Sequence, residues 1–272
     1  MKTIDSLHNA SLICGFEYEA RCLKLAGIKN KIGISGANTK KTKEVAERLI
    51  SSGSEVLISI GLAGGLDPRF GPGSLILADQ VLLAEPSIFG EKKVSTMSDL
   101  GDIFSFRESS NLANSHESAI KNIDSVGIIF DTDKGLNRKL LGLLNVEVTR
   151  GLIMGVDKAI TTPRDKIRMF GMTGCLACDM ESHVIAKVAN SAGIPFIVLR
   201  VVCDPSNRYI PKCALKSLTD KGRTSYSGVI AEVCLRPWEL PDLLSVWYDS
   251  RIAFKALSNA ARMSLPLFES LR

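Results

Sequence analysis

The stretch Leu176-Ala-Cys-Asp-Met-Glu-Ser-His183, followed after a helical segment by Phe196-Ile-Val-Leu-Arg-Val-Val-Cys-Asp-Pro205, decides the fold class of this chain. The second apolar run is rich in β-branched residues and ends abruptly at Asp204, which is typical of a buried strand in a parallel sheet. Strand, helix and strand in so short a stretch predict a right-handed βαβ unit whose strands end at the same edge of the sheet. Glu181 and Asp204 are then expected to lie close together at that edge, where ligands of open α/β sheets bind.

The remainder of the chain alternates between strand and helix patterns. This alternation predicts an α/β fold with a mixed, mostly parallel central sheet flanked by helices. No linker divides the chain, so we expect an α/β domain over residues 1–235 and a helical C-terminal extension over residues 236–272. Further strands are expected at 11–15, 31–35, 56–60, 74–84, 126–130 and 146–155, and helices at 17–26, 40–51, 112–122, 163–171 and 184–193.

Composition limits the class of protein. Hydrophobic residues make up 45% of the 272 positions and charged residues 23%, as in ordinary globular proteins. The net charge of +5 permits an anionic ligand or membrane surface without requiring one, and no nucleic-acid partner is expected. No apolar stretch reaches membrane-spanning length and no signal-peptide pattern opens the chain, which predicts a cytoplasmic protein.

The cysteines and histidines predict neither a disulfide framework nor a metal site. Seven cysteines occur without regular spacing. Cys175 and Cys178 form a C-x-x-C pair, but no second pair of cysteines or histidines completes a zinc site. Reduced thiols in or near the core are therefore expected. His8, His116 and His183 do not form a ligand set, and no metal or organic cofactor is predicted.

Glycines and acids follow several predicted strands. The sequence Gly61-Leu-Ala-Gly-Gly65 matches neither the dinucleotide nor the P-loop fingerprint, which disfavours a dehydrogenase. These glycines either allow backbone N–H groups to approach a sugar or anion, or form a tight turn. Glu181 is suited to bind two ribose hydroxyls, and Asp204 to protonate a purine ring nitrogen. Each acid also has a structural interpretation, as a first-turn helix acid and as a turn initiator before proline respectively.

Together these residues resemble the nucleoside phosphorylase and nucleosidase superfamily. A closer resemblance, to the hopanoid-associated phosphorylases or adenosylhopane nucleosidases, lies in Gly-Leu-Asp-Pro68, Arg236-Pro-Trp-Glu-Leu-Pro241 and Asp249-Ser-Arg-Ile-Ala-Phe254. This resemblance implies removal of adenine from adenosylhopane, a lipid-linked substrate, by a homo-oligomeric enzyme. The motifs shared with the wider superfamily are those at 61–66, 73–77, 151–157, 179–183 and 196–204, together with Glu19.

The resemblance implies a role for each matching residue. Asp204 would protonate adenine N7 or donate a hydrogen bond to it, as the base departs. Glu181 would bind the ribose hydroxyls, with Met180 against the sugar. The other substrate-binding residues that it implies are Arg200, which orients the attacking water or phosphate, the backbone of Ala159 and Ile160 at the purine edge, and Gly64.

Two positions depart from the superfamily pattern. Leu62 occupies a position where nucleosidases usually have Ser. An apolar residue there suits a nucleoside substrate with an apolar 5′ substituent. Glu19 matches the nucleosidase carboxylate that activates water, and phosphorylases place an Arg there. A phosphate dianion beside a carboxylate is unfavourable, so Glu19 favours water. Inorganic phosphate remains open as a co-substrate.

The C-terminal tail has two interpretations. Trp238, Trp247 and neighbouring leucines form amphipathic helical material, preceded by a basic stretch with Lys212, Lys216 and Arg223. The tail either contacts an anionic membrane surface as a peripheral anchor, or docks on the core or on another subunit. Two other functions also remain open: cleavage of small purine nucleosides, and nucleoside binding without catalysis.

Overall fold

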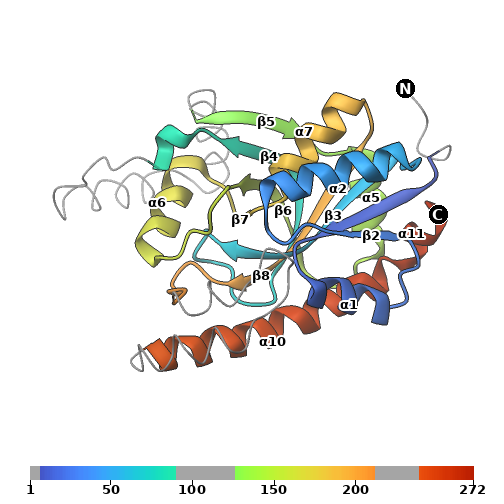
Figure 1. Ribbon diagram of the computed structural model, residues 1–272. Helices are drawn as coiled ribbons and strands as arrows, with labels where there is room; N and C mark the ends of the chain where they lie inside the picture. The colour runs from blue at the N-terminus through green and yellow to red at the C-terminus, as the bar shows by residue number, and fades with distance from the viewer. Residues whose placement is uncertain (1–6, 90–125, 212–238) are drawn as a thin grey trace.

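A sheet of eight strands organises the computed structural model, which describes residues 7–89, 126–211 and 239–272 (Figure 1). Its strands are β1 (Ala10–Cys14), β2 (Lys31–Ile34), β3 (Val56–Gly65), β4 (Leu75–Ala84), β5 (Gly127–Asp131), β6 (Val148–Gly155), β7 (Ala177–Asp179) and β8 (Phe196–Asp204). The helices are α1 (Glu17–Leu25), α2 (Thr39–Ser51), the 3-10 turn η2 (Pro86–Phe89), α5 (Lys134–Leu143), α6 (Pro163–Thr173), α7 (Ser182–Ala192), α10 (Leu240–Met263) and α11 (Leu265–Ser270).

This mixed sheet with flanking helices confirms the predicted fold class. Five strand pairs are parallel and three are antiparallel. The predicted helix at 112–122, the boundary at 235/236 and the basic stretch before the tail lie outside the described residues.

Five of the strands close into a ring. Strand β3 pairs with β8, β8 with β4, β4 with β6, β6 with β7, and β7 again with β3. Within the ring, Gly64 of β3 is the register partner of Cys178 on one side and of Asp204 on the other. The C-terminal half of β3 therefore lies between the two segments that carry the predicted acids.

The prediction of a βαβ unit with parallel strands is wrong about the direction of β7 relative to β8. Strand β8 runs parallel to β3, whereas β7 runs antiparallel to it, and the two do not pair with each other. The antiparallel direction carries Asp179 back towards Arg200, whose partner on β3 is Gly61. Glu181 follows Asp179 in the chain, and its side chain contacts Arg200. Glu181 and Asp204 line the same cavity.

Strand β3 is also longer than predicted. It continues beyond Ile60 to Gly65, so the glycine-rich stretch is strand and not a turn. Positive φ angles occur at six described glycines, and none of them belongs to β3. The tight-turn interpretation of this stretch is therefore wrong, and its glycines serve close packing against neighbouring side chains.

Two layers of helices cover the sheet (Figure 1). Helices α2 and α7 pack on one face, where Val45, Leu49 and Ile185 join inward-facing residues of β3 and β8. Helices α1, α5, α10 and α11 cover the other face, with Leu257 and Phe268 fully buried there. A third cluster lies beneath α6. Burying apolar side chains on both faces supplies the main driving force for this fold.

Helix α10 docks on the core along only one of its faces. Ala253, Leu257, Ala260 and Ala261 are buried against α1 and the sheet. This arrangement confirms docking of the tail, within the described residues. None of the described helices combines the length and apolar character needed to cross a membrane. The opposite face leaves large apolar side chains exposed, namely Leu240, Leu244, Trp247, Tyr248 and Ile252.

Candidate active site

A cavity of about 1390 Å³ opens where β3, β7 and β8 end beside α1 and α10. Asp204 and Glu181 both line it, as the sequence predicted, although by a different strand arrangement. Glu19 and Arg200 are buried behind its wall. The other predicted residues that line the cavity are Met180, Gly64, Ala159 and Ile160.

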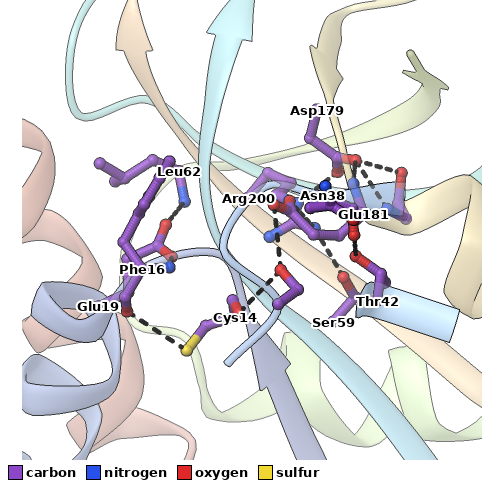
Figure 2. A network of polar contacts seen from close by, with 12 residues as sticks. Cys14, Phe16, Glu19, Asn38, Thr42, Ser59, Leu62, Asp179, Glu181 and Arg200 are labelled. Atoms are coloured by element: carbon purple, nitrogen blue, oxygen red, sulfur yellow. Dashed lines mark hydrogen bonds and ion pairs between the residues drawn. The ribbon is translucent and has the colours of Figure 1, made fainter. Parts of the chain in front are cut away.

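A buried cluster of polar and charged groups adjoins the cavity, and two of its members, Asp179 and Glu181, belong to the cavity lining (Figure 2). The Arg200 guanidinium donates through Nε to Asp179 Oδ2 at 2.5 Å and through Nη2 to Ser59 Oγ at 2.6 Å. Its Nη2 also lies 3.5 Å from Glu181 Oε2. Its Nη1 has no hydrogen-bond partner among the described residues. Arg200 thus contacts two carboxyl groups, and its Nη1 nitrogen stays without a partner in this part of the structure.

Glu19 is held by backbone donors. Its Oε1 accepts from the Leu62 N–H at 2.7 Å, and its Oε2 accepts from the Phe16 N–H at 2.8 Å (Figure 2). The second bond is the capping-box contact at the start of α1. Glu19 is therefore a first-turn acid of α1. The same contacts also fix its carboxylate near Arg200.

Two glycines make room for the carboxylates. A Cβ atom on Gly61 would lie 2.6 Å from Glu19 Oε1 and 2.9 Å from Arg200 Nη1. A Cβ atom on Gly15 would lie 2.7 Å from Glu181 Oε1. Such contacts are too short for real carbon atoms, so glycine is required for the close approach of backbone to carboxylates.

The cluster contains more acid than base, and burial makes this imbalance strong. Burial raises the pKa of Glu181 to about 8, against the attraction of Arg200 and with added repulsion from Asp179 and Glu19. Burial also raises the pKa of Glu19. Burial also tends to raise the pKa of Asp179. The positive charge of Arg200 and the hydrogen bonds from Ser182 have the larger effect, so the pKa of Asp179 is lowered. Asp179 is therefore the ionised partner of Arg200, and Glu181 carries a proton near neutral pH.

The Glu181 proton predicts how stability depends on pH. Its folded pKa of about 8 exceeds the ordinary value of 4.5, so the folded state binds more protons between these values. The stability that this group contributes is present at low pH and is lost as pH rises through 8, by up to about 1.4 kcal/mol per pH unit. Urea unfolding of wild type and Glu181→Gln across this window measures it. The difference between the two proteins should change with pH, and a constant difference would contradict this assignment.

Asp204 has a lysine partner that sequence reasoning missed. Lys166 of α6 is fully buried, and its Nζ lies 2.6 Å from Asp204 Oδ2. Burial raises the pKa of Asp204, and the positive charge of Lys166 opposes that rise. The sequence did contain a signal, because Lys166 shares the helix face of Met169, Phe170 and Thr173, which are all buried. A lysine at a core position of a helix indicates a buried carboxylate partner.

The described cysteines are free thiols. Cys14, Cys22, Cys175, Cys178 and Cys203 form no disulfide. Burial raises the pKa of the Cys175 thiol to about 12, so it is neutral at physiological pH. Among the described residues, no group of three His, Cys, Asp or Glu side chains is placed to hold a metal ion.

Comparisons with known proteins show which chains this one is similar to. A 5′-methylthioadenosine/S-adenosylhomocysteine nucleosidase of Shewanella halifaxensis (strain HAW-EB4) is 26% identical over 235 residues, covering 84% of this chain and 91% of that protein. The crystal structure of such a nucleosidase from Helicobacter pylori, with butyl-thio-DADMe-Immucillin-A, matches with a TM-score of 0.61 at 15% identity, covering 98% of this chain and 100% of that one. The futalosine hydrolase of Helicobacter pylori strain 26695 matches with a TM-score of 0.58 at 15% identity, covering 97% of both chains.

At these identities the solved structures show a shared fold. The family assignment comes from the sequence itself, since residues 24–221 match the model of the phosphorylase superfamily. That match spans well over half of the 272 residues. The chain therefore belongs to the phosphorylase superfamily.

Proposed function

We propose that this protein cleaves the N-glycosidic bond of an adenine nucleoside. The observation that carries the proposal is the placement of Asp204, Glu181 and Met180 on one cavity, with Glu19 and Arg200 directly behind it. Asp204 protonates the departing base at N7, and Glu181 binds the ribose hydroxyls with Met180 against the sugar. The backbone of Ala159 and Ile160 and the strand at Gly64 complete the walls around the base and sugar.

Charge supports this assignment of roles. Breaking the bond between base and ribose leaves positive charge on the sugar, by analogy with glycoside hydrolysis. Three carboxyl groups, those of Glu19, Asp179 and Glu181, surround one arginine beside the cavity. Asp179 is ionised and balances the charge of Arg200, so this cluster offers no unpaired positive charge to an anionic ligand and does not oppose a cationic sugar.

The same charges favour water over phosphate as the nucleophile. A phosphate dianion would find no unpaired cation in this cluster, because Arg200 is paired with Asp179 and also donates to Ser59. Within the described part of the chain, Arg200 Nη1 has no hydrogen-bond partner and is available to orient a water molecule. Glu19, whose pKa burial raises, accepts the proton that the water gives up.

The size of the cavity supports a substrate with a large apolar 5′ group. Small-molecule sites usually enclose about 300–1,000 Å³, and this cavity has about 1390 Å³. Its lining includes apolar side chains of α10, among them Leu243, Val246 and Phe254, and Leu62 of β3. We therefore propose adenosylhopane as the substrate, as the resemblance of the sequence suggests. The second candidate is a small nucleoside such as methylthioadenosine, favoured by the nucleosidase relatives.

A chain-length series tests the proposed substrate. Purified protein is incubated with methylthioadenosine, with adenosines bearing longer 5′-alkyl groups and with adenosylhopane, and adenine release is followed. We expect kcat/KM to rise with the length of the apolar group, and a Leu62→Ser variant to lose part of this preference. A flat series would favour small nucleosides. Binding without adenine release from any substrate would favour a non-catalytic module.

We also propose that the mouth of the cavity contacts an anionic lipid surface. Leu244, Trp247, Tyr248 and Ile252 form an exposed stripe on α10, and Tyr18 of α1 is exposed beside it. Cationic side chains accompany these apolar residues at the cavity mouth, namely Arg21 and Lys24 on α1 and Arg251 on α10. Apolar side chains flanked by cations suit a bilayer that contains anionic lipids.

Vesicle flotation tests this contact. The protein should float with vesicles containing phosphatidylglycerol and not with neutral vesicles. Tyr248→Glu should abolish flotation, whereas Ile128→Glu, at a similarly exposed apolar residue on β5, should not. No flotation, combined with a dimer that Tyr248→Glu dissociates, would assign this surface to a second copy of the chain.

A further inference from the structure

Lys166 occupies an unusual position for a lysine. Its side chain is fully buried, and its Nζ contacts Asp204 Oδ2 at 2.6 Å. The same nitrogen donates to the backbone carbonyls of Asp204 at 3.2 Å, Pro205 at 3.1 Å and Arg208 at 3.2 Å. Asp204 is its only carboxylate partner among the described residues. These contacts fix the ammonium group where it meets one oxygen of Asp204.

A purely structural role would not require a lysine. Burying an ammonium group costs several kcal/mol even when it is paired, and apolar residues of similar size are often as stable. The hydrogen bonds to three carbonyls fix only the backbone at the end of β8 and just after it. The contact with Asp204 Oδ2, in contrast, reaches a side chain that lines the cavity.

We propose that Lys166 is a positioning residue that acts through Asp204 by fixing which carboxyl oxygen carries the proton given to the leaving base. This inference rests on the proposed nucleoside cleavage. An ammonium group donates and cannot accept, so Oδ2 facing Lys166 Nζ stays unprotonated. The acidic proton is therefore on Oδ1, the oxygen that Lys166 does not engage.

The proton count of the reaction is balanced. The Oδ1 proton moves to adenine N7 while the bond between C1′ and N9 breaks, and the bonding electrons leave with the base. Asp204 becomes a carboxylate, which the Lys166 ammonium stabilises at 2.6 Å. Water adds to C1′ and gives its proton to Glu19. After the products leave, Glu19 releases this proton to solvent and Asp204 takes one up at Oδ1, which restores both side chains.

The charge of Lys166 also sets how readily Asp204 gives up its proton. Burial alone favours the neutral acid, and Asp249 of α10 adds to this effect. Asp249 is itself paired with Arg208 at 2.7 Å. The thiols of Cys178 and Cys203 also approach Asp204, and their raised pKa values keep them neutral. Lys166 is the group that opposes burial, so without it Asp204 is a weaker acid.

Two leaving groups distinguish this role from a structural one. Lys166→Met should lower kcat for adenine release by about 100-fold, the scale of general acid assistance, with little change in KM. The alkaline limb of its pH profile should shift upward, because Asp204 keeps its proton to higher pH. With 4-nitrophenyl riboside, whose leaving group needs no proton, activity should stay near that of wild type. Lys166→Arg should retain most adenine release.

Loss of the same factor on both substrates, with an unshifted alkaline limb, would overturn the inference and leave Lys166 a structural role. A separate measurement does not depend on turnover. Carbon-13 NMR titration of the Asp204 carboxyl should give a higher pKa in Lys166→Met than in wild type, and equal values would also overturn the inference. If wild type releases no adenine from any nucleoside, the proposed function fails, while this titration still tests the coupling of the two side chains.

Discussion

Asp204→Asn is expected to lower kcat for adenine release by about 10²–10⁴-fold, the contribution of a general acid. The asparagine oxygen can still accept from Lys166 Nζ, which lies 2.6 Å from Oδ2 in the native protein. Its amide group can donate a hydrogen bond to the base but cannot transfer a proton. Substrate binding should therefore be largely retained while turnover is lost. Steady-state kinetics together with calorimetric titration of a substrate analogue measure the two effects separately.

Asp131→Asn is the matched control for this variant. Asp131 lies on β5, is exposed and accepts from Gln80 at 2.8 Å, so the same change of atoms occurs far from the cavity. Its kinetics should equal those of wild type. Turnover of Asp204→Asn within a few-fold of wild type would remove Asp204 from the mechanism.

The largest loss of stability is expected for Arg200→Met. This change leaves the ionised Asp179 buried without its cation, and removing one member of a buried ion pair typically costs about 3–5 kcal/mol. The side chains of Arg200 and Asp179 are both almost completely buried, so water cannot screen the charge of Asp179 once the arginine is removed. Urea unfolding at neutral pH should reveal the decrease.

Arg150→Met provides the comparison. Arg150 pairs with Asp79 at the surface, where both side chains are exposed, and such pairs contribute about 0–1 kcal/mol. Equal destabilisation by the two substitutions would contradict the account of the cluster. Partial recovery of Arg200→Met at acidic pH is also expected, because protonation neutralises the stranded carboxylate.

The sequence predicted the layers of this fold better than its strand directions. The apolar run at 196–203 and the helical rhythm at 40–51 come from local periodicity, and both elements are present. The direction of β7 depends on which neighbour it joins, and three residues carry no local information about that choice. Its antiparallel pairing with β3 is a tertiary effect, as is the extension of β3 through glycines whose missing side chains admit Glu19 and Arg200.

The sequence predicted the site residues that follow a recognisable strand pattern. It did not predict those whose role depends on the three-dimensional arrangement of the strands and helices. Glu181 and Asp204 follow predicted strands, which placed them at the edge of the sheet. The role of Asp179 as the partner of Arg200 depends on the reversal of β7, which no sequence pattern revealed. Lys166 lies 38 residues before Asp204 in the chain, and only its position on a buried helix face indicated its pairing.

Adenine release measured with and without inorganic phosphate tests the central claim most directly. Arg200 is paired with Asp179, and its Nη1 has no hydrogen-bond partner among the residues that the structure describes, so we predict that water attacks the sugar. Purified protein should release adenine from its nucleoside at the same rate in phosphate-free buffer and in phosphate, with the free sugar as product. Release that requires phosphate and yields the sugar 1-phosphate would contradict the account.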